Sequence, residues 1–264
     1  MDNRPIGIFD SGLGGMTVLK ELVDLMPQES FVFFGDTAHV PYGNKSSESI
    51  ENFSISIINF LQTHSVKLIV VACNTASAVV LNKIKKDFDI PIIGVIEPIK
   101  FYLQNNKTPQ SIGIIGTENT INSRAYDKII LSYSNKIKIY SKSCPLFVPI
   151  IEEGLESHKI TEIIAQEYLQ TMINKKINLL ILGCTHYPII KNIIQNLLTI
   201  DVAIVDSANL IANYIKSFLN KNDMIAANNH ANIKIYVSDQ PIQFQKQSSK
   251  FFGQNIPQVI EVKL

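Results

Sequence analysis

The chain has 264 residues, enough for one large or two smaller hydrophobic cores, and 46% of them are hydrophobic. Its 24 Lys and Arg balance its 23 Asp and Glu, and because the lysines stand singly or in pairs the composition does not favour a nucleic-acid partner. Residues 1–5 are too polar for a signal peptide and no stretch reaches the roughly 18 apolar residues of a membrane span, so we expect a cytoplasmic protein without a membrane partner.

The first predicted strand, residues 6–9, runs into a glycine-rich segment at 10–15, and a helix is expected over 17–26. Glycine lets the backbone turn sharply and approach a ligand closely. The segment lacks the Lys-Ser/Thr pair of a P-loop and the full G-x-G-x-x-G spacing, so a nucleotide site is not favoured. The carboxylate of Asp10 at the strand end is a candidate functional group, although it could instead cap the helix.

A strand at 31–35 and a polar loop at 36–44 follow, and then a long amphipathic helix is expected over 46–65, with Ser46 or Ser47 as its N-cap. The apolar run that comes next predicts a strand buried on both faces. It ends at Cys73, where a helix begins. Ligands bind at this end of strands in open α/β sheets. The N–H groups and partial positive charge of the helix start favour a thiolate there.

The remaining elements alternate in the same way. We expect strands at 91–95, 111–117, 136–141, 178–183, 202–206, 233–237 and 259–262. We expect helices at 119–133, 161–175, 189–194, 207–219 and 242–252, with Ser207 as the N-cap of the helix at 207–219. The segment at 144–149 is expected to be irregular. The Glu97-Pro98 break is interpreted as a domain crossing. Strands that alternate with helices predict mostly parallel sheets with helices on both faces.

The segment 178–188 repeats the pattern of 68–77, because an apolar run again ends in a cysteine, Cys184, followed by a threonine and a helix-like stretch. This repetition indicates two related halves that each present one thiol. The predicted fold class is therefore α/β, with two pseudo-symmetric doubly wound domains and an active site in the cleft between them.

Two thiols on opposite sides of one carbon can invert a stereocentre, since one removes a proton and the other returns one to the opposite face. Cysteine suits this task because its ordinary pKa of about 8.5 makes both protonation states accessible near neutral pH. Asp10 and His186 are the natural partners for the two thiols. Asn74, Thr75 and Thr185 are donors of the kind that would hold a substrate carboxylate.

Other readings of the cysteines remain open. An odd number of cysteines argues against a disulfide framework, and Cys144 has no context beyond a structural one. A metal site formed by Cys73, Cys184 and His186 lacks a usual zinc spacing. A reversible disulfide between the two twinned thiols would make a redox sensor.

Four segments in order, at 9–15, 36–43, 73–76 and 183–188, resemble the glutamate racemase family of bacteria over essentially the whole chain. The resemblance implies cofactor-independent interconversion of L- and D-glutamate for peptidoglycan synthesis, with no metal, and we expect a homodimer. It implies that Cys184 deprotonates L-glutamate and Cys73 D-glutamate, that Asp10 assists Cys73, and that His186 and Glu152 assist Cys184. The positions that it assigns to substrate binding are Ser11, Pro41, Tyr42, Gly43, Asn74, Thr75, Thr117 and Thr185.

The resemblance also implies that the C-terminal segment completes the first domain, so we assign 1–97 with 207–264 to it and 98–206 to the second domain. One position departs from the family pattern, because His39 stands where an arginine is usual and an imidazole lacks the permanent charge of a guanidinium. Loop order or assembly could differ as a result. A racemase for aspartate or a hydantoin, and an amino-acid-binding regulator without turnover, are the competing hypotheses.

Overall fold

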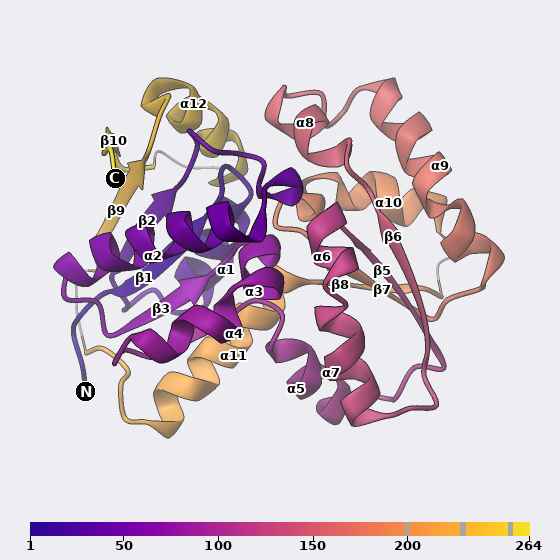
Figure 1. Ribbon diagram of the computed structural model, residues 1–264, viewed down its shortest axis with the longest axis horizontal. Helices are drawn as coiled ribbons and strands as arrows, with labels where there is room; N and C mark the ends of the chain where they lie inside the picture. Colours follow the sequence, from indigo (N-terminus) through magenta and orange to yellow (C-terminus); the bar gives the residue numbers. More distant parts are fainter. Residues whose placement is uncertain (199–200, 228–230, 253–255) are drawn as a thin grey trace.

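The computed structural model describes residues 1–198, 201–227, 231–252 and 256–264, and it contains two parallel β-sheets (Figure 1). The first sheet has the order β10-β9-β2-β1-β3-β4, formed by β1 (Ile6–Asp10), β2 (Phe31–Gly35), β3 (Leu68–Val71), β4 (Ile92–Gly94), β9 (Ile233–Val237) and β10 (Val259–Glu261). The second has the order β6-β5-β7-β8, formed by β5 (Ser111–Gly116), β6 (Lys138–Ser143), β7 (Leu179–Gly183) and β8 (Ala203–Asp206). The predicted α/β class with parallel sheets is confirmed.

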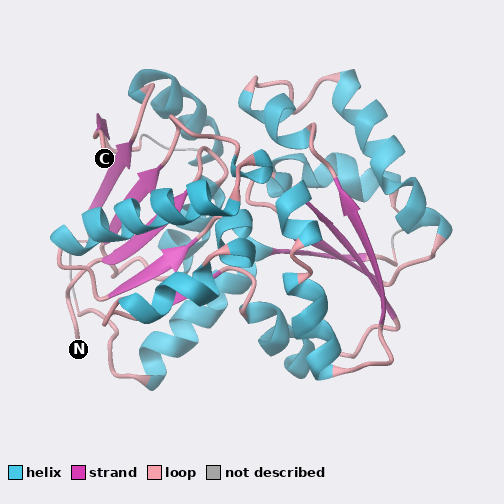
Figure 2. Cartoon of the chain, viewed as in Figure 1, coloured by secondary structure: helices cyan, strands magenta, loops and turns pink. Residues whose placement is uncertain are grey.

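Helices lie on both faces of each sheet (Figure 2). They are α1 (Gly15–Leu25), α2 (Ser47–Thr63), α3 (Asn74–Val79), α4 (Leu81–Ile84), α5 (Pro98–Asn105), α6 (Glu118–Asn122), α7 (Ala125–Tyr133), α8 (Phe147–Glu152), α9 (Lys159–Asn174), α10 (Lys191–Leu197), α11 (Ser207–Lys221) and α12 (Pro241–Phe252), with short 3₁₀ turns η1 (Tyr42–Asn44), η2 (Lys85–Asp87) and η3 (Tyr187–Ile190). None of the described helices is long and apolar enough to span a membrane.

The layers follow from the alternation of side chains along each strand. In β1, Ile6 and Ile8 pack with helices α1 and α11, whereas Phe9 faces the opposite way toward α2. The second sheet divides in the same manner, since Ile112 packs toward α5 and α7 and Leu180 toward α9 and α10. The core that contains α1 and α11 continues onto the second sheet, so one apolar layer joins the two halves of the chain.

The strand order places the two thiols at equivalent points. The series β2-β1-β3-β4 in the first sheet corresponds to β6-β5-β7-β8 in the second. In each series the chain runs from the first central strand to one edge of the series, and then crosses to the second central strand and on to the other edge. The position between the two central strands is the switch point, where open α/β sheets bind ligands. Cys73 follows β3 and Cys184 follows β7, each at the carboxyl end of a strand beside the switch point.

Several elements differ from the prediction. The helix expected over 119–133 is split into α6 and α7, because Arg124 adopts a left-handed conformation (φ 52°) and the Ser123 hydroxyl accepts a hydrogen bond from the N–H of Ala125. The segment around Pro149, expected to be irregular, forms α8. Pro149 lies in the first turn, where its missing N–H costs nothing.

Two helix starts also differ. Helix α5 was not predicted, and Pro98 begins it at a position where proline is well tolerated. The N-cap of α11 is Asp206 rather than Ser207, since the Asp206 carboxylate accepts a hydrogen bond from the Asn209 N–H at 2.9 Å. The N-cap of α2 is Ser46, one of the two predicted candidates.

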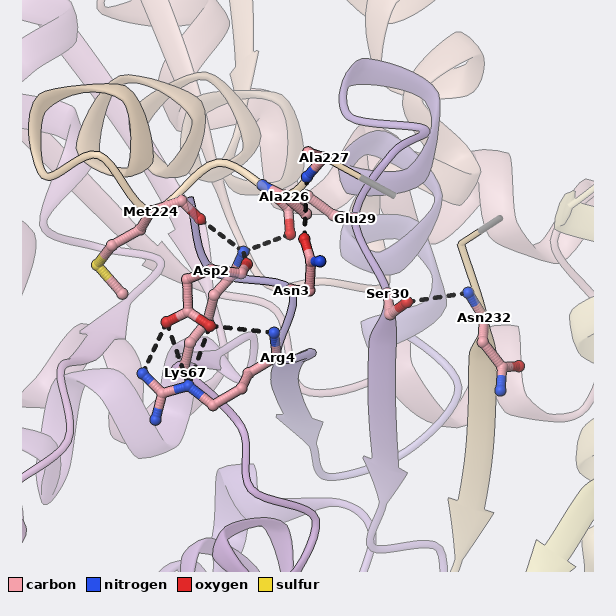
Figure 3. A network of polar contacts seen from close by, with 10 residues as sticks. All are labelled: Asp2, Asn3, Arg4, Glu29, Ser30, Lys67, Met224, Ala226, Ala227 and Asn232. Atoms are coloured by element: carbon pink, nitrogen blue, oxygen red, sulfur yellow. Dashed lines mark hydrogen bonds and ion pairs between the residues drawn. The ribbon is translucent and has the colours of Figure 1, made fainter. Parts of the chain in front are cut away.

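A fully buried ion pair lies at the amino-terminal edge of the first sheet (Figure 3). The Nζ of Lys67, just before β3, donates to Glu29 at 2.6 Å and to the carbonyl oxygens of Asp2 and Met224 at 2.8 and 2.7 Å. The other oxygen of Glu29 accepts the N–H of Ala226 at 2.8 Å. Four separate chain segments are thereby tied at one point.

Candidate active site

Cys73 is the N-cap residue of α3 and exposes only 4% of its surface. Its sulfur accepts a hydrogen bond from the Ala76 N–H at 3.5 Å and donates to the Ser11 hydroxyl at 3.8 Å. The turn that carries this thiol therefore also contacts the glycine-rich segment after β1.

The start of α3 favours a thiolate at Cys73, as expected, because the Ala76 N–H lowers the pKa of the thiol, but burial outweighs this effect. Burial raises the pKa of Cys73 from 9.0 to about 12, and the charge of Asp10 acts in the same direction. The Ala76 N–H and the Ser11 hydroxyl oppose this shift without cancelling it. The desolvation of a buried sulfur thus exceeds the effect of a single short helix, and Cys73 holds a proton at neutral pH.

Cys184 is linked to a histidine and a glutamate in series. Its sulfur lies 3.8 Å from Nδ1 of His186, and Nε2 of the same ring lies 2.6 Å from Oε1 of Glu152. Burial alone would lower the pKa of His186, but the hydrogen bonds to Cys184 and Glu152 outweigh it and hold that pKa well above its usual value. The raised pKa of His186 favours a cationic ring 3.8 Å from the Cys184 sulfur.

Asp10 accepts several hydrogen bonds from the turn that follows it. Its Oδ2 accepts the N–H groups of Gly12 and Gly15 at 3.1 and 2.9 Å, and its Oδ1 accepts the Thr185 hydroxyl at 3.3 Å. Gly15 begins α1, so the carboxylate does cap that helix. It also reaches the turn of Cys184, and its negative charge acts on Cys73 without a described hydrogen bond to it.

The glycine-rich segment packs directly on the second thiol turn. A Cβ placed on Gly14 would collide with His186 and Thr185, and one on Gly12 would come within 3.0 Å of Glu152. The Leu13 N–H donates to Glu152 at 3.4 Å. We expected these glycines to approach a ligand, and in the structure they let the two halves of the site approach each other.

The polar residues that the family resemblance assigned to substrate binding lie on both sides of the same junction. Thr75 and Thr117 join through their hydroxyls at 2.9 Å, and Gly43 packs on Thr117. Pro41 is partly exposed. The other seven residues of this set are buried, namely Ser11, Tyr42, Gly43, Asn74, Thr75, Thr117 and Thr185. Asn74, Thr75 and Thr185 belong to the two thiol turns, and contacts connect Ser11, Thr117 and Gly43 to the turn of Cys73.

Three residues at this junction were not assigned to the site from the sequence. Tyr126 of α7 donates its hydroxyl to Oδ1 of Asn74 at 2.7 Å, and Nδ2 of Asn74 donates to Ser207 at 3.1 Å. Thr120 joins Thr117 through a 2.9 Å hydroxyl contact. These partners are far apart in the sequence, apart from the Thr117–Thr120 pair. Only that pair has a local signal, the i, i+3 spacing at a helix start.

His39 keeps the loop after β2 attached to the first half. Its ring stacks on Phe53 with centroids 4.0 Å apart, and its Nδ1 lies 2.9 Å from the carboxylate of Asp36. Asp36 also accepts the hydroxyls of Tyr42 and Ser238 at 2.6 and 2.8 Å. The loop is therefore held around Asp36 with a histidine in the usual arginine position.

The third cysteine, Cys144, is buried in the core of the second half, where its carbonyl accepts the Tyr187 hydroxyl at 3.0 Å. These contacts agree with a structural role. Within the described ranges, no group of three or more His, Cys, Asp or Glu side chains is arranged to hold a metal ion.

Comparison with known proteins identifies relatives over the full length of the chain. The family model described as Asp/Glu/Hydantoin racemase matches residues 10–215. A glutamate racemase from Geobacter metallireducens is 40% identical over 262 residues, covering 99% of this chain and 97% of the relative. The crystal structure of glutamate racemase from Francisella tularensis in complex with D-glutamate superposes with a TM-score of 0.91 and 38% identity, covering 100% and 98% of the two chains.

A more distant structure, an aspartate racemase homologue from Pyrococcus horikoshii, has a TM-score of 0.60 and 18% identity, with 82% of this chain and 99% of that chain covered. At this identity the likeness shows the shared fold alone.

Proposed function

The chain belongs to the Asp/Glu/hydantoin racemase family, and from this premise we propose that it interconverts L-glutamate and D-glutamate without a cofactor. Full-length relatives near 40% identity are glutamate racemases, and a structure with 38% identity holds D-glutamate. The aspartate racemase homologue shares much less sequence. Glutamate is therefore the favoured substrate.

The observation that carries the proposal is the pair of thiols, Cys73 and Cys184, at equivalent strand ends of two sheets with the same central strand order. Each thiol has its own neighbours. Cys184 has His186 and Glu152, whereas Cys73 has Asp10 as the nearby charge. Two acid–base groups with different environments suit a reaction that needs one base and one acid.

In the proposed L-to-D direction, the Cys184 thiolate takes the Cα proton of L-glutamate, and the electron pair of that bond passes into the carboxylate-stabilised carbanion. The Cys73 thiol then gives its proton to the opposite face, which leaves D-glutamate, a Cys73 thiolate and a Cys184 thiol. The raised pKa of Cys73 and the protonated His186 beside Cys184 support this starting state. The D-to-L direction reverses each step, with Asp10 assisting Cys73.

The same proposal includes the roles of Ser11, Pro41, Tyr42, Gly43, Asn74, Thr75, Thr117 and Thr185 in holding the substrate. It also includes the division into 1–97 with 207–264 and 98–206, with the active site between these domains. Supply of D-glutamate for peptidoglycan, a cytoplasmic location and a homodimer rest on the family resemblance.

The first test is circular dichroism of the purified protein with D-glutamate, and separately with D-aspartate, in deuterated water without added cofactor. We expect loss of optical activity with glutamate alone, and mass analysis should find one deuteron in the inverted product. Loss with aspartate alone would change the substrate but keep the chemistry. Unchanged signals with both would contradict racemase activity.

The two-thiol mechanism predicts that Cys73→Ala and Cys184→Ala each abolish racemisation, because each removes one of the two proton carriers. The matched control is Cys144→Ala, which removes a buried thiol away from the reacting groups and should retain turnover. Circular dichroism of the backbone checks that the variants fold. Substantial turnover in either of the first two variants would refute the mechanism.

A further inference from the structure

Tyr126 contacts the turns of both thiols. It lies on α7 and only 3% of its surface is exposed. A Cβ placed on Gly183, the residue before Cys184, would come within 3.2 Å of the Tyr126 ring. The hydroxyl of the same side chain donates to Asn74, the residue after Cys73, at 2.7 Å.

The amide of Asn74 is held at both ends. Its Oδ1 accepts the Tyr126 hydroxyl, and its Nδ2 donates to the hydroxyl of Ser207 at 3.1 Å. All three side chains are buried, at 2% exposure for Asn74 and 1% for Ser207. Displacement of the amide from these two hydroxyls would therefore leave buried polar groups without partners, which is costly.

We propose that Tyr126 is a positioning residue, which orients the Asn74 amide through its hydroxyl and sets the spacing between the two thiol turns through its ring. The inference rests on the proposed function, in which Asn74 holds the substrate beside Cys73. Tyr126 does not belong to the proton-transfer groups, so its effect on turnover passes through Asn74.

The Tyr126→Phe variant separates the two parts of this role. It keeps the ring against Gly183 and removes only the hydroxyl. The loss of one buried hydrogen bond corresponds to a fall in kcat/KM of about tenfold. Both directions should fall equally, because the equilibrium constant between two enantiomers is one.

A double-mutant cycle on kcat/KM combines Tyr126→Phe with Asn74→Ala. If the hydroxyl acts through Asn74, the roughly tenfold effect disappears once Asn74 is alanine. A general structural defect would instead reduce activity by the same factor in both backgrounds. Should turnover of Asn74→Ala be too slow to measure, the same cycle is read from the Kd of L-glutamate in a Cys184→Ala background, where no turnover occurs.

The matched control is Tyr133→Phe on the same helix, which removes an exposed hydroxyl that contacts Thr108. Its kcat/KM should equal that of the wild type. Wild-type kinetics in Tyr126→Phe, or an effect that persists fully without the Asn74 amide, would overturn the positioning role while leaving the racemase proposal intact. An unmodified chain without turnover would instead refute the proposed function itself.

Discussion

At the scale of single residues, Cys73 and Cys184 have the same place in the fold and different chemical surroundings. Each follows a buried strand at a sheet switch point. Cys184 lies beside a histidine whose pKa is raised by its hydrogen bonds to Cys184 and Glu152, whereas Cys73 is buried between the Ala76 N–H and the Ser11 hydroxyl, near the carboxylate of Asp10. The difference comes from neighbours supplied by other strands. Two turns at equivalent places in the fold thus have different polar neighbours, as the proposed acid–base pair requires.

The raised pKa of Cys73 predicts a loss of stability at alkaline pH. Between its ordinary value of 9.0 and its folded value of about 12, the folded state keeps a proton that the unfolded chain has lost. The contribution of Cys73 to the free energy of unfolding is thus fully present below pH 9 and falls as pH rises through this window. By pH 10 the loss is on the order of 1 kcal/mol.

Urea unfolding of the wild type and of Cys73→Ala between pH 7 and pH 10 measures this loss. The wild type should lose on the order of 1 kcal/mol more than the variant over this range. Cys73→Ser is the matched control, since a hydroxyl of similar size does not titrate and should behave like alanine. Parallel pH profiles for all three proteins would show that Cys73 has the same pKa in both states.

At the scale of elements, the glycine-rich turn after β1 acts as a spacer between the halves of the site. A Cβ on Gly14 would collide with the side chains of His186 and Thr185. Gly14→Ala should therefore push the second thiol turn away from the first. A displacement near 1 Å can cost on the order of 100-fold in rate, so we expect kcat/KM for glutamate to fall by about that factor.

Gly7→Ala on the preceding strand is the control for this prediction. A Cβ there would meet only side chains, at 3.3 Å and beyond, so the added methyl group should leave kcat/KM within a few-fold of the wild type. Thermal unfolding of both variants separates lost activity from lost folding. A Gly14→Ala variant with wild-type kinetics would contradict the spacer role.

The sequence predicted these elements where its signal is local. Buried apolar runs located β3 and β7, and a cysteine at the end of each run located both thiols. Helix α5 and the break between α6 and α7 were missed, because a proline at a helix start and a left-handed Arg124 leave no periodic signal. The Tyr126 contact was missed for a different reason. It joins α7 to α3, and such contacts follow from the packing of whole helices.

At the scale of the whole molecule, the two halves share one apolar layer, and both cysteine turns are buried. Cys73 and Cys184 have 4% and 5% exposure. The Thr185–Asp10 and Thr17–Thr185 hydrogen bonds join the Cys184 turn to the end of β1 and to α1, and Cys73 contacts the segment between them through Ser11. Polar contacts of this kind are exchanged easily for water. We therefore expect substrate entry to separate these turns while the layer around α1 and α11 remains packed.

The stability of the first half depends on the buried Lys67–Glu29 pair, which ties the N-terminal segment, β3, the α1–β2 connection and the segment after α11. Lys67→Met leaves the Glu29 carboxylate buried without its cation, so the free energy of unfolding should fall by about 3–5 kcal/mol in urea titration. The matched control, Lys83→Met, breaks an exposed pair with Glu51 and should cost less than about 1 kcal/mol.

Adding Glu29→Leu to Lys67→Met removes the buried carboxylate that has lost its cation, and should recover much of the lost free energy of unfolding. If the double variant were as unstable as Lys67→Met alone, the cost would come from the lost carbonyl contacts of Asp2 and Met224 rather than from the uncompensated carboxylate.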